Sequence, residues 1–159
     1  MKFKTKILAI IFMLILIPIT CFADFSVKSD YKDFDFTTGV YNLSGNVTVQ
    51  FPVQNETMTV VADKAKVELY QQQVHSSGNV KLQWGALSFA CAKVDVFHQE
   101  RTAYMEGGLV FDANGQHITS SSGTYCWKTK IATFSGNVVH NGTPKGNSLT
   151  YDFNNNSFR

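Results

Sequence analysis

The sequence is short of the features that mark several common classes of protein. It has 3 prolines and 3 cysteines in 159 residues, and only 16% of its residues carry a charge. It contains no phosphate-binding loop and no CxxC, HExxH or GxSxG motif. Beyond residue 23, no stretch combines the helical period with helix caps. These absences argue against a helical domain and against motif-defined enzymes, so we expect no catalytic activity.

Positive charge is also scarce once the first residues are set aside. The chain has 14 basic and 12 acidic side chains, and 3 of the basic ones are Lys2, Lys4 and Lys6. The remainder carries 11 basic against 12 acidic groups, which excludes the basic surface that nucleic-acid binding requires. The four histidines lack the spacing of metal ligands, so neither a metal site nor a cofactor is expected: His75, His98, His117 and His140.

The first residues have the pattern of an export signal. Three lysines precede an apolar run over residues 7–19, which Pro18 interrupts, and small residues at Cys21 and Ala23 suit cleavage after Ala23. The run is shorter than the roughly 20 residues of a membrane-spanning helix, although an uncleaved anchor stays open. We therefore expect a signal peptide over residues 1–23 and a periplasmic location.

Two cysteines follow the predicted cleavage site, Cys91 and Cys126. Export permits a disulfide between them. The alternative is that both are small buried hydrophobic side chains. The sequence leaves both open, because it does not give the Cα separation, which a disulfide limits to about 7 Å.

A tetrapeptide repeat organises the rest of the chain. Ser-Gly-Asn-Val occurs at residues 44–47, 77–80 and 135–138, with a weaker copy at residues 106–109, so that the glycines are 33, 29 and 29 residues apart. Apolar side chains alternate in one phase on both sides of each glycine, which indicates half-buried strands. Because the alternation continues through the glycine, we expect a bend or bulge there and not a hairpin turn.

Further strands are predicted between these repeats. Asn114-Gly115 and Asn141-Gly142 are strong signals for hairpin turns. The chain therefore reads as an all-β sandwich, jelly roll or short solenoid. The additional short strands cover residues 57–60, 65–70, 86–89, 93–97, 116–119, 124–127 and 148–151.

Three segments together resemble the OstA-like family, which includes the lipopolysaccharide-transport protein LptA: residues 39–49, 61–67 and 146–152. The resemblance covers residues 36–153, and the third repeat departs from it because Gly107-Gly108 replaces Gly-Asn. It implies an open, twisted antiparallel β-jelly roll of stacked ~30-residue strand repeats. Residues 24–35 are expected to form a leading strand or flexible arm, and residues 154–159 a frayed tail. LptA, the periplasmic part of LptC and a relative of the translocon's periplasmic domain all stay open as counterparts.

The resemblance also implies a function and partners. Such proteins carry the acyl chains of lipid A along an apolar groove, between an inner-membrane transporter and an outer-membrane translocon. Edge strands near residues 36–40 and 148–153 are expected to pair with LptC-type and LptD-type proteins, or head to tail with another copy. The expected groove residues are Val47, Val49, Val67, Leu69, Val80, Leu82, Leu87, Phe89, Val94, Val96, Leu109, Phe111, Ile118 and Phe134.

Two other functions compete with lipid transport. The apolar set is equally expected in a structural or adhesive β-repeat protein that buries a dry core and binds no lipid. A secreted glycan-binding jelly roll is the third reading, and it requires aromatic side chains such as Tyr125 and Trp127 to face outward.

Overall fold

The computed structural model describes residues 25–159, so the signal peptide predicted for residues 1–23 lies outside the described residues. Within that range the chain is all-β, and it has no helix long and apolar enough to cross a membrane. The strands are β1 (Ser26–Lys28), β2 (Tyr31–Asp35), β3 (Val40–Val53), β4 (Glu56–Glu68), β5 (Gln73–Trp84), β6 (Leu87–Phe97), β7 (Thr102–Ala113), β8 (Gln116–Cys126), β9 (Ile131–His140), β10 (Thr143–Asp152) and β11 (Ser157–Phe158).

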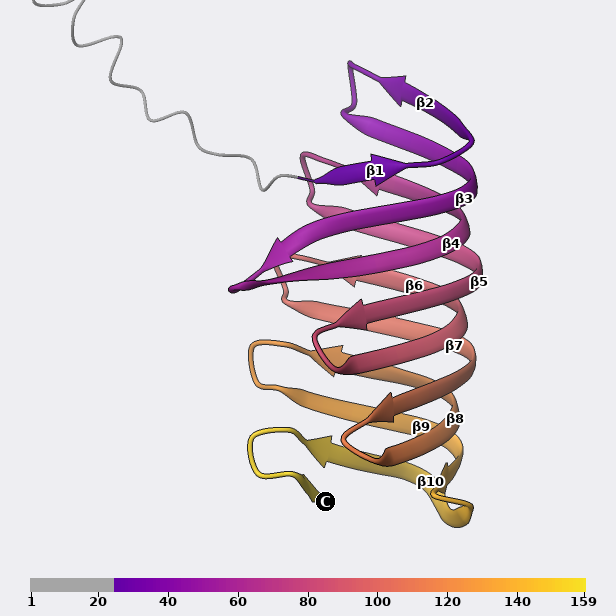
Figure 1. Cartoon of the computed structure of the whole chain (residues 1–159), viewed down its shortest axis with the longest axis vertical. Coiled ribbons are helices and arrows are strands. Elements are labelled where there is room, and N and C mark those ends of the chain that lie inside the picture. The colour runs from indigo at the N-terminus through magenta and orange to yellow at the C-terminus, as the bar shows by residue number, and fades with distance from the viewer. Residues whose placement is uncertain (1–24) are drawn as a thin grey trace, which may run out of the picture.

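All these strands belong to one open antiparallel sheet, in which strands that follow one another along the chain are also neighbours. The exception is the first edge, where β1 and β2 pair with different parts of β3. Each long strand bends sharply, so the sheet folds over into two facing layers, and successive strands are stacked along the long axis (Figure 1). The predicted open antiparallel jelly roll of stacked repeats is confirmed.

The bends lie at the repeated Gly-Asn pairs. Gly45 and Asn46 both have a left-handed backbone, with φ of 73° and 48°, and the pairing of β3 with β4 shifts between Ser44 and Val47. Glycine adopts this conformation without steric cost, and asparagine tolerates it better than most residues. Because β3 continues through the pair, the predicted bend is confirmed and a hairpin turn is excluded.

The third repeat forms the same bend although it lacks the asparagine. Gly107 and Gly108 have φ of 84° and 75°, and the register between β6 and β7 shifts at this position as it does elsewhere. A second glycine is an adequate substitute for asparagine, because the left-handed backbone is what the bend requires. The departure from the family pattern therefore preserves the geometry.

The even-numbered strands correct one prediction. The short strands expected at residues 57–60 and 65–70 are two halves of β4, and β6 and β8 join their halves in the same way. Buried side chains alternate up to Ala62 in β4 and resume at Ala65, so the phase changes by one residue opposite the bend. Because the alternation changes phase within each of these strands, a period-two pattern predicts two short strands where the structure has one.

Two aspartates support the first two bends. The carboxylate of Asp30 accepts a hydrogen bond of 2.8 Å from the Asn46 side-chain amide, and Asp63 accepts one of 2.9 Å from Asn79. The equivalent neighbours of the third and fourth bend glycines are Ala92 and Ser121. The bends thus form a continuous column along one side of the molecule.

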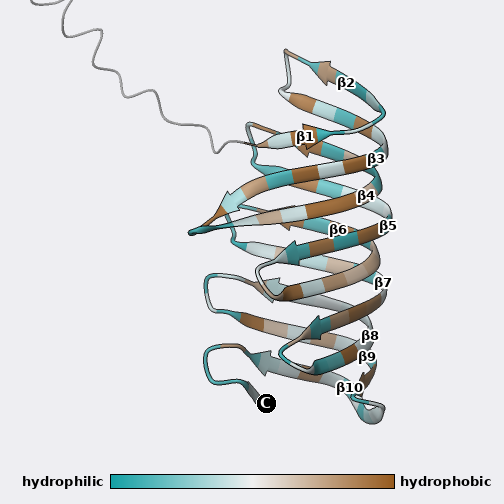
Figure 2. Cartoon of the chain, in the orientation of Figure 1, coloured by the Kyte–Doolittle hydropathy of each residue, from teal (hydrophilic) through white to brown (hydrophobic). Residues whose placement is uncertain are grey.

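Inward-facing side chains of both layers form one core. Apolar and polar residues alternate along the strands, visible as brown and teal bands in Figure 2. The positions two before and two after each bend glycine are all buried, as the repeat predicts: Leu43, Val47, Ser76, Val80, Met105, Leu109, Phe134 and Val138.

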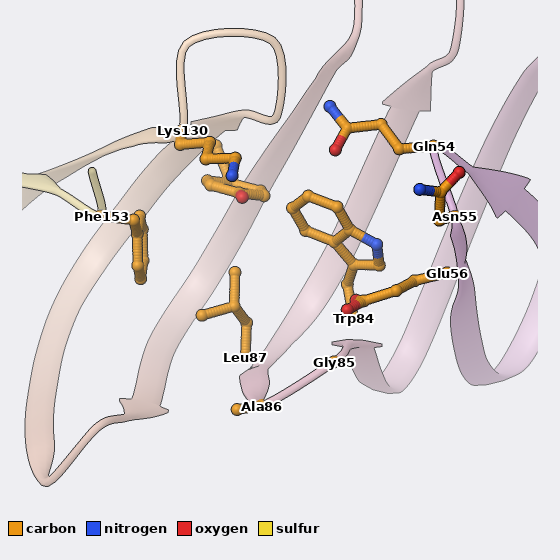
Figure 3. Close-up of a pocket in the computed structure, with 10 residues that line it drawn as sticks. Gln54, Asn55, Glu56, Trp84, Gly85, Ala86, Leu87, Lys130 and Phe153 are labelled. Carbon is orange, nitrogen blue, oxygen red and sulfur yellow. The ribbon is translucent and has the colours of Figure 1, made fainter.

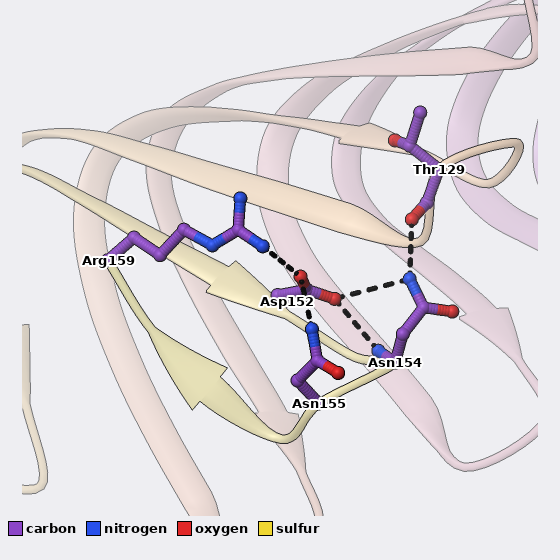
Figure 4. A network of polar contacts seen from close by, with 5 residues as sticks. All are labelled: Thr129, Asp152, Asn154, Asn155 and Arg159. Atoms are coloured by element: carbon purple, nitrogen blue, oxygen red, sulfur yellow. Dashed lines mark hydrogen bonds and ion pairs between the residues drawn. The ribbon is translucent and has the colours of Figure 1, made fainter.

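The C-terminal segment is ordered, so the prediction of a frayed tail over residues 154–159 is wrong. Residues of β11 pair with the end of β10, and Asp152, only 3% exposed, accepts hydrogen bonds from the side chains of Asn154, Asn155 and Arg159 (Figure 4). Burial raises the pKa of Asp152, but the backbone N–H of Asn154 and these side-chain donors outweigh it, and the pKa lies below its usual value. The polar C-terminal segment is ordered because its side-chain donors bind one buried carboxylate, that of Asp152.

Candidate functional site

Two rows of turns lie on the side of the molecule away from the bends. We call the turns at residues 54–55, 85–86 and 114–115 the first rim, and those at residues 69–72, 98–101, 127–130 and 153–156 the second rim. Each rim belongs to one layer of the folded sheet (Figure 1). Residues of both rims line shared clefts. The gap between the rims is here called the mouth.

The expected groove residues come together between the layers. All except two are buried, and Leu69 and Leu87 are half-buried beside the rims. Every bent repeat contributes to this interior, which extends as a single cluster from β3 to β10. The buried members are Val47, Val49, Val67, Val80, Leu82, Phe89, Val94, Val96, Leu109, Phe111, Ile118 and Phe134.

Aromatic contacts close the mouth. Phe51 and Trp84 precede first-rim turns and meet rings of the other layer: the Phe51–His98 centroids are 6.0 Å apart and the Trp84–Tyr125 centroids 5.8 Å. His98 in turn contacts Trp127 at 6.2 Å. Such pairs contribute about 0.5–1.5 kcal/mol each beyond their burial. This closure is not predicted from the sequence; the available signal is that aromatic residues recur at strand ends beside turns.

The same contacts remove the support for a glycan-binding face. Tyr125 is 1% exposed and Trp127 is 2% exposed, so neither ring is available on the outer surface. Burial raises the pKa of the Tyr125 hydroxyl, and the nearby Cys126 and Glu56 raise it further. The condition for a glycan-binding function, that these two aromatics face outward, is therefore not met.

Two clefts open at the mouth. The first has a volume of about 370 Å³ and lies between Glu56 and Trp84 of the first rim and Lys130 and Phe153 of the second (Figure 3). In Figure 3, Trp84 occupies the centre, with Lys130 and Phe153 on one side and Glu56 on the other. Both clefts include Gln54 in their walls.

The second cleft has a volume of about 290 Å³ and lies between Pro52 on one rim and His98, Arg101 and Trp127 on the other. Burial lowers the pKa of His98, and the positive charge of Arg101 lowers it further, so the imidazole is neutral at pH 7. The side-chain nitrogens Trp84 Nε1 and His98 Nδ1 are buried and have no hydrogen-bond partner. Such an unsatisfied buried group costs about 1–3 kcal/mol.

The cysteines do not form the disulfide that the sequence left open. Cys91 and Cys126 are free thiols on β6 and β8, and β7 lies between these strands. Two inter-strand spacings amount to about 9.6 Å, more than the Cα separation of a disulfide. Burial raises the pKa of Cys91 to about 11.

The sheet edges differ from the predicted ones. Residues 36–40 are not an edge, because Val40 pairs on both sides, with Asp35 of β2 and Glu68 of β4. The first edge is β1 and β2, and Phe36 in the turn that follows is 82% exposed. At the other end, β11 pairs with Tyr151 and Asp152 of β10, so the unpaired part of this edge strand is residues 143–148. Pro144 and two register shifts make this part irregular.

Comparison with known proteins gives one family and a fold. The family model described as OstA-like protein matches residues 26–150. Among solved structures, the chain is similar to LptH, the LptA-homologous periplasmic component of the lipopolysaccharide transport device of Pseudomonas aeruginosa. The TM-score is 0.63 at 14% identity, over 72% of this chain and 83% of LptH. No curated protein matches the sequence. At this identity the likeness to LptH concerns the fold alone.

Proposed function

Because the chain belongs to the OstA-like protein family, we propose that it is a periplasmic lipopolysaccharide-binding bridge subunit with no enzymatic activity. It carries the acyl chains of lipid A in its interior, between an inner-membrane transporter and an outer-membrane translocon. Its neighbours are LptC-type and LptD-type proteins, which pair with the β1–β2 edge and with residues 143–148, and copies of the chain join head to tail through the same edges. The observation that carries the proposal is the continuous apolar interior beside a lateral mouth.

The lining is suited to movement along the molecule and not to storage at one site. Successive repeats place similar side chains at equivalent depth, such as Val47, Val80 and Leu109, all of which are buried. A ligand that leaves one repeat therefore regains equivalent contacts in the next. A single deep pocket would instead hold the ligand in place.

Entry of an acyl chain requires the two layers to part at the mouth. Two aromatic contacts bridge the gap at the mouth, Phe51–His98 and Trp84–Tyr125. Separating them costs about 2 kcal/mol at about 1 kcal/mol each, in addition to the burial that the rings lose. Burying six methylene groups gains about 5 kcal/mol at about 0.8 kcal/mol each. Partial insertion of one chain thus offsets the loss of these two contacts.

The chain contains its own reporters for a test. It has two tryptophans, Trp84 and Trp127, and each lines one cleft of the mouth. Bromine atoms on an acyl chain quench indole fluorescence on contact. We expect brominated lipid A to quench both tryptophans in detergent-free protein, while the unbrominated lipid and a free oligosaccharide quench neither. The variants Trp84→Phe and Trp127→Phe assign the signal to one cleft each.

A dry-core structural or adhesive protein is the second candidate, and one observation favours it: the expected groove residues already fill the interior without a ligand. That function predicts that brominated lipid A leaves both tryptophans unquenched at concentrations where the protein stays folded. This outcome would reject the lipid-carrier proposal.

A further inference from the structure

The last strand covers the edge of the sheet in one layer only. β11 pairs with Tyr151 and Asp152, and the backbones of Thr150 and Arg159 exchange hydrogen bonds of 3.2 and 2.8 Å. This part of β10 pairs on its other side with residues 131–135 of β9, in the layer that ends at the second rim. We call residues 153–159 the cap. The cap therefore occupies the edge at which this layer could be extended by another strand.

The cap also closes one end of the apolar interior. Phe158 is half-buried, and its ring centroid lies 4.7 Å from that of Tyr151 and 4.3 Å from that of His140. Tyr151 belongs to the layer of the second rim, whereas His140 pairs with the buried Ile118 in the layer of the first rim. Phe158 thus bridges the two layers beyond the last long strand.

At the opposite end of the molecule, β2 has the equivalent place. It pairs with residues 40–44 of β3 in the same layer, and among residues 25–159 no strand pairs with its other side. Phe34 of β2 packs on Tyr41 with ring centroids 4.2 Å apart, as Phe158 packs on Tyr151. The five paired residues of β2 match in number the five of β10, residues 148–152, that pair with β9 in this layer.

We propose that the cap is a releasable stop on assembly, and that β2 of a second copy of the chain displaces it, pairs with residues 148–152 and opens this end of the interior. The inference rests on the head-to-tail joining in the proposed function and adds the step that regulates it. Displacement exchanges Phe158 for Phe34 of the incoming copy, so one aromatic ring replaces another beside Tyr151.

The geometry makes the capped form the resting state. Strand β2 and residues 148–152 both run from the bends toward the second rim, so pairing between two copies is parallel. Parallel pairing is slightly less stable per residue than the antiparallel pairing of β11. The cap is also part of the same chain, which gives it a high effective concentration, and three of its side chains donate to Asp152. A second copy therefore prevails only at high protein concentration or when the cap is loosened.

The test loosens the cap and leaves both pairing edges unchanged. Phe158→Asp removes the ring that bridges the layers, and Phe97→Asp makes the same change at a half-buried ring on the outer face of β6. Self-association of the full chain is measured by analytical ultracentrifugation over a range of concentrations without lipid. We expect a dissociation constant about tenfold lower for Phe158→Asp than for wild type, because the cap loses the burial of one half-buried ring. The Phe97→Asp control should associate as wild type does.

Hydrogen exchange then locates the interface in the assembled Phe158→Asp protein. The amides of residues 31–35 and 148–150 should become protected as the concentration rises. Self-association that Phe158→Asp leaves unchanged would overturn the cap, and so would new protection confined to other segments.

Quenching by brominated lipid A, measured on the same variants, tests the proposed function separately. Normal quenching with unchanged self-association would overturn the cap and leave lipid carriage standing. Increased self-association through residues 31–35 without quenching would support the cap and overturn lipid carriage.

Discussion

Gly78→Ala is the substitution that examines the bend column most directly. Gly78 has φ of 78°, and an added Cβ would lie 2.5 Å from Asp63 Oδ2 and 2.9 Å from Asp63 Cβ. Neither distance is tolerable, so the Asp63 side chain and its strand must shift. The shift breaks the hydrogen bond of 2.9 Å from Asn79 to Asp63. The variant therefore combines backbone strain with loss of a contact between repeats.

Gly142→Ala supplies the matched control. Its φ is 79°, nearly the same as that of Gly78, but no atom lies within 4 Å of the added Cβ. The left-handed conformation costs alanine about 1–2 kcal/mol at either site. Displacing the Asp63 carboxylate from Asn79 adds about 1.5 kcal/mol at Gly78 alone. We expect losses of about 3 kcal/mol for Gly78→Ala and about 1.5 kcal/mol for Gly142→Ala.

Urea unfolding of the two variants beside wild type measures the difference. The midpoint should fall for both, twice as far for Gly78→Ala, with the same dependence of unfolding free energy on urea concentration. Equal losses in the two variants would refute the reasoning, because they would show that the close approach between Gly78 and Asp63 contributes nothing.

Three further results are expected. Phe111→Ala should lower the free energy of unfolding, measured by urea unfolding, by about 4 kcal/mol, because Phe111 is fully buried and its ring centroid is 4.9 Å from that of Phe89. A loss below about 1 kcal/mol would contradict this packing. Because the pKa of Asp152 is lowered in the folded protein, its ionised carboxylate stabilises the fold above the ordinary carboxyl pKa, and this stability is lost as the pH falls through the lowered value. Asp152→Asn should therefore reduce the fall in thermal unfolding temperature at acid pH. An unchanged dependence of that temperature on pH would contradict the role of Asp152. At pH 8 a thiol reagent should label half-buried Cys126 well before Cys91, whose pKa is raised to about 11; equal rates would contradict the burial.

The repeats could be predicted because their information is local. A period-two pattern fixes which side chains face inward, so Val47, Val80 and Leu109 were assigned to the interior from sequence and are buried. The Gly-Asn pair indicates a left-handed backbone by itself, and its position within an unbroken alternation distinguishes a bend from a turn. Stacking these bends then leaves little freedom in the order of the strands.

The mouth could not be predicted because it depends on the angle of the fold. Trp84 and Tyr125 are 41 residues apart in the numbering, and they meet only because the bends bring the two rims together. The ordered C-terminus was missed for a related reason. From sequence, Asn154 and Asn155 are typical of a solvated tail. In the structure their side-chain amides both donate to the buried Asp152.

Photocrosslinking tests the central claim, that acyl chains enter the interior, more directly than any change in affinity. A photoreactive aromatic amino acid is placed at Phe111, which is buried between the layers, and in a second protein at Tyr104, which is 41% exposed on the same strand. After irradiation with lipopolysaccharide, the account predicts a crosslinked product from position 111 and none from position 104. Crosslinking at position 104 alone, or at neither position while fluorescence reports a folded protein, would contradict it.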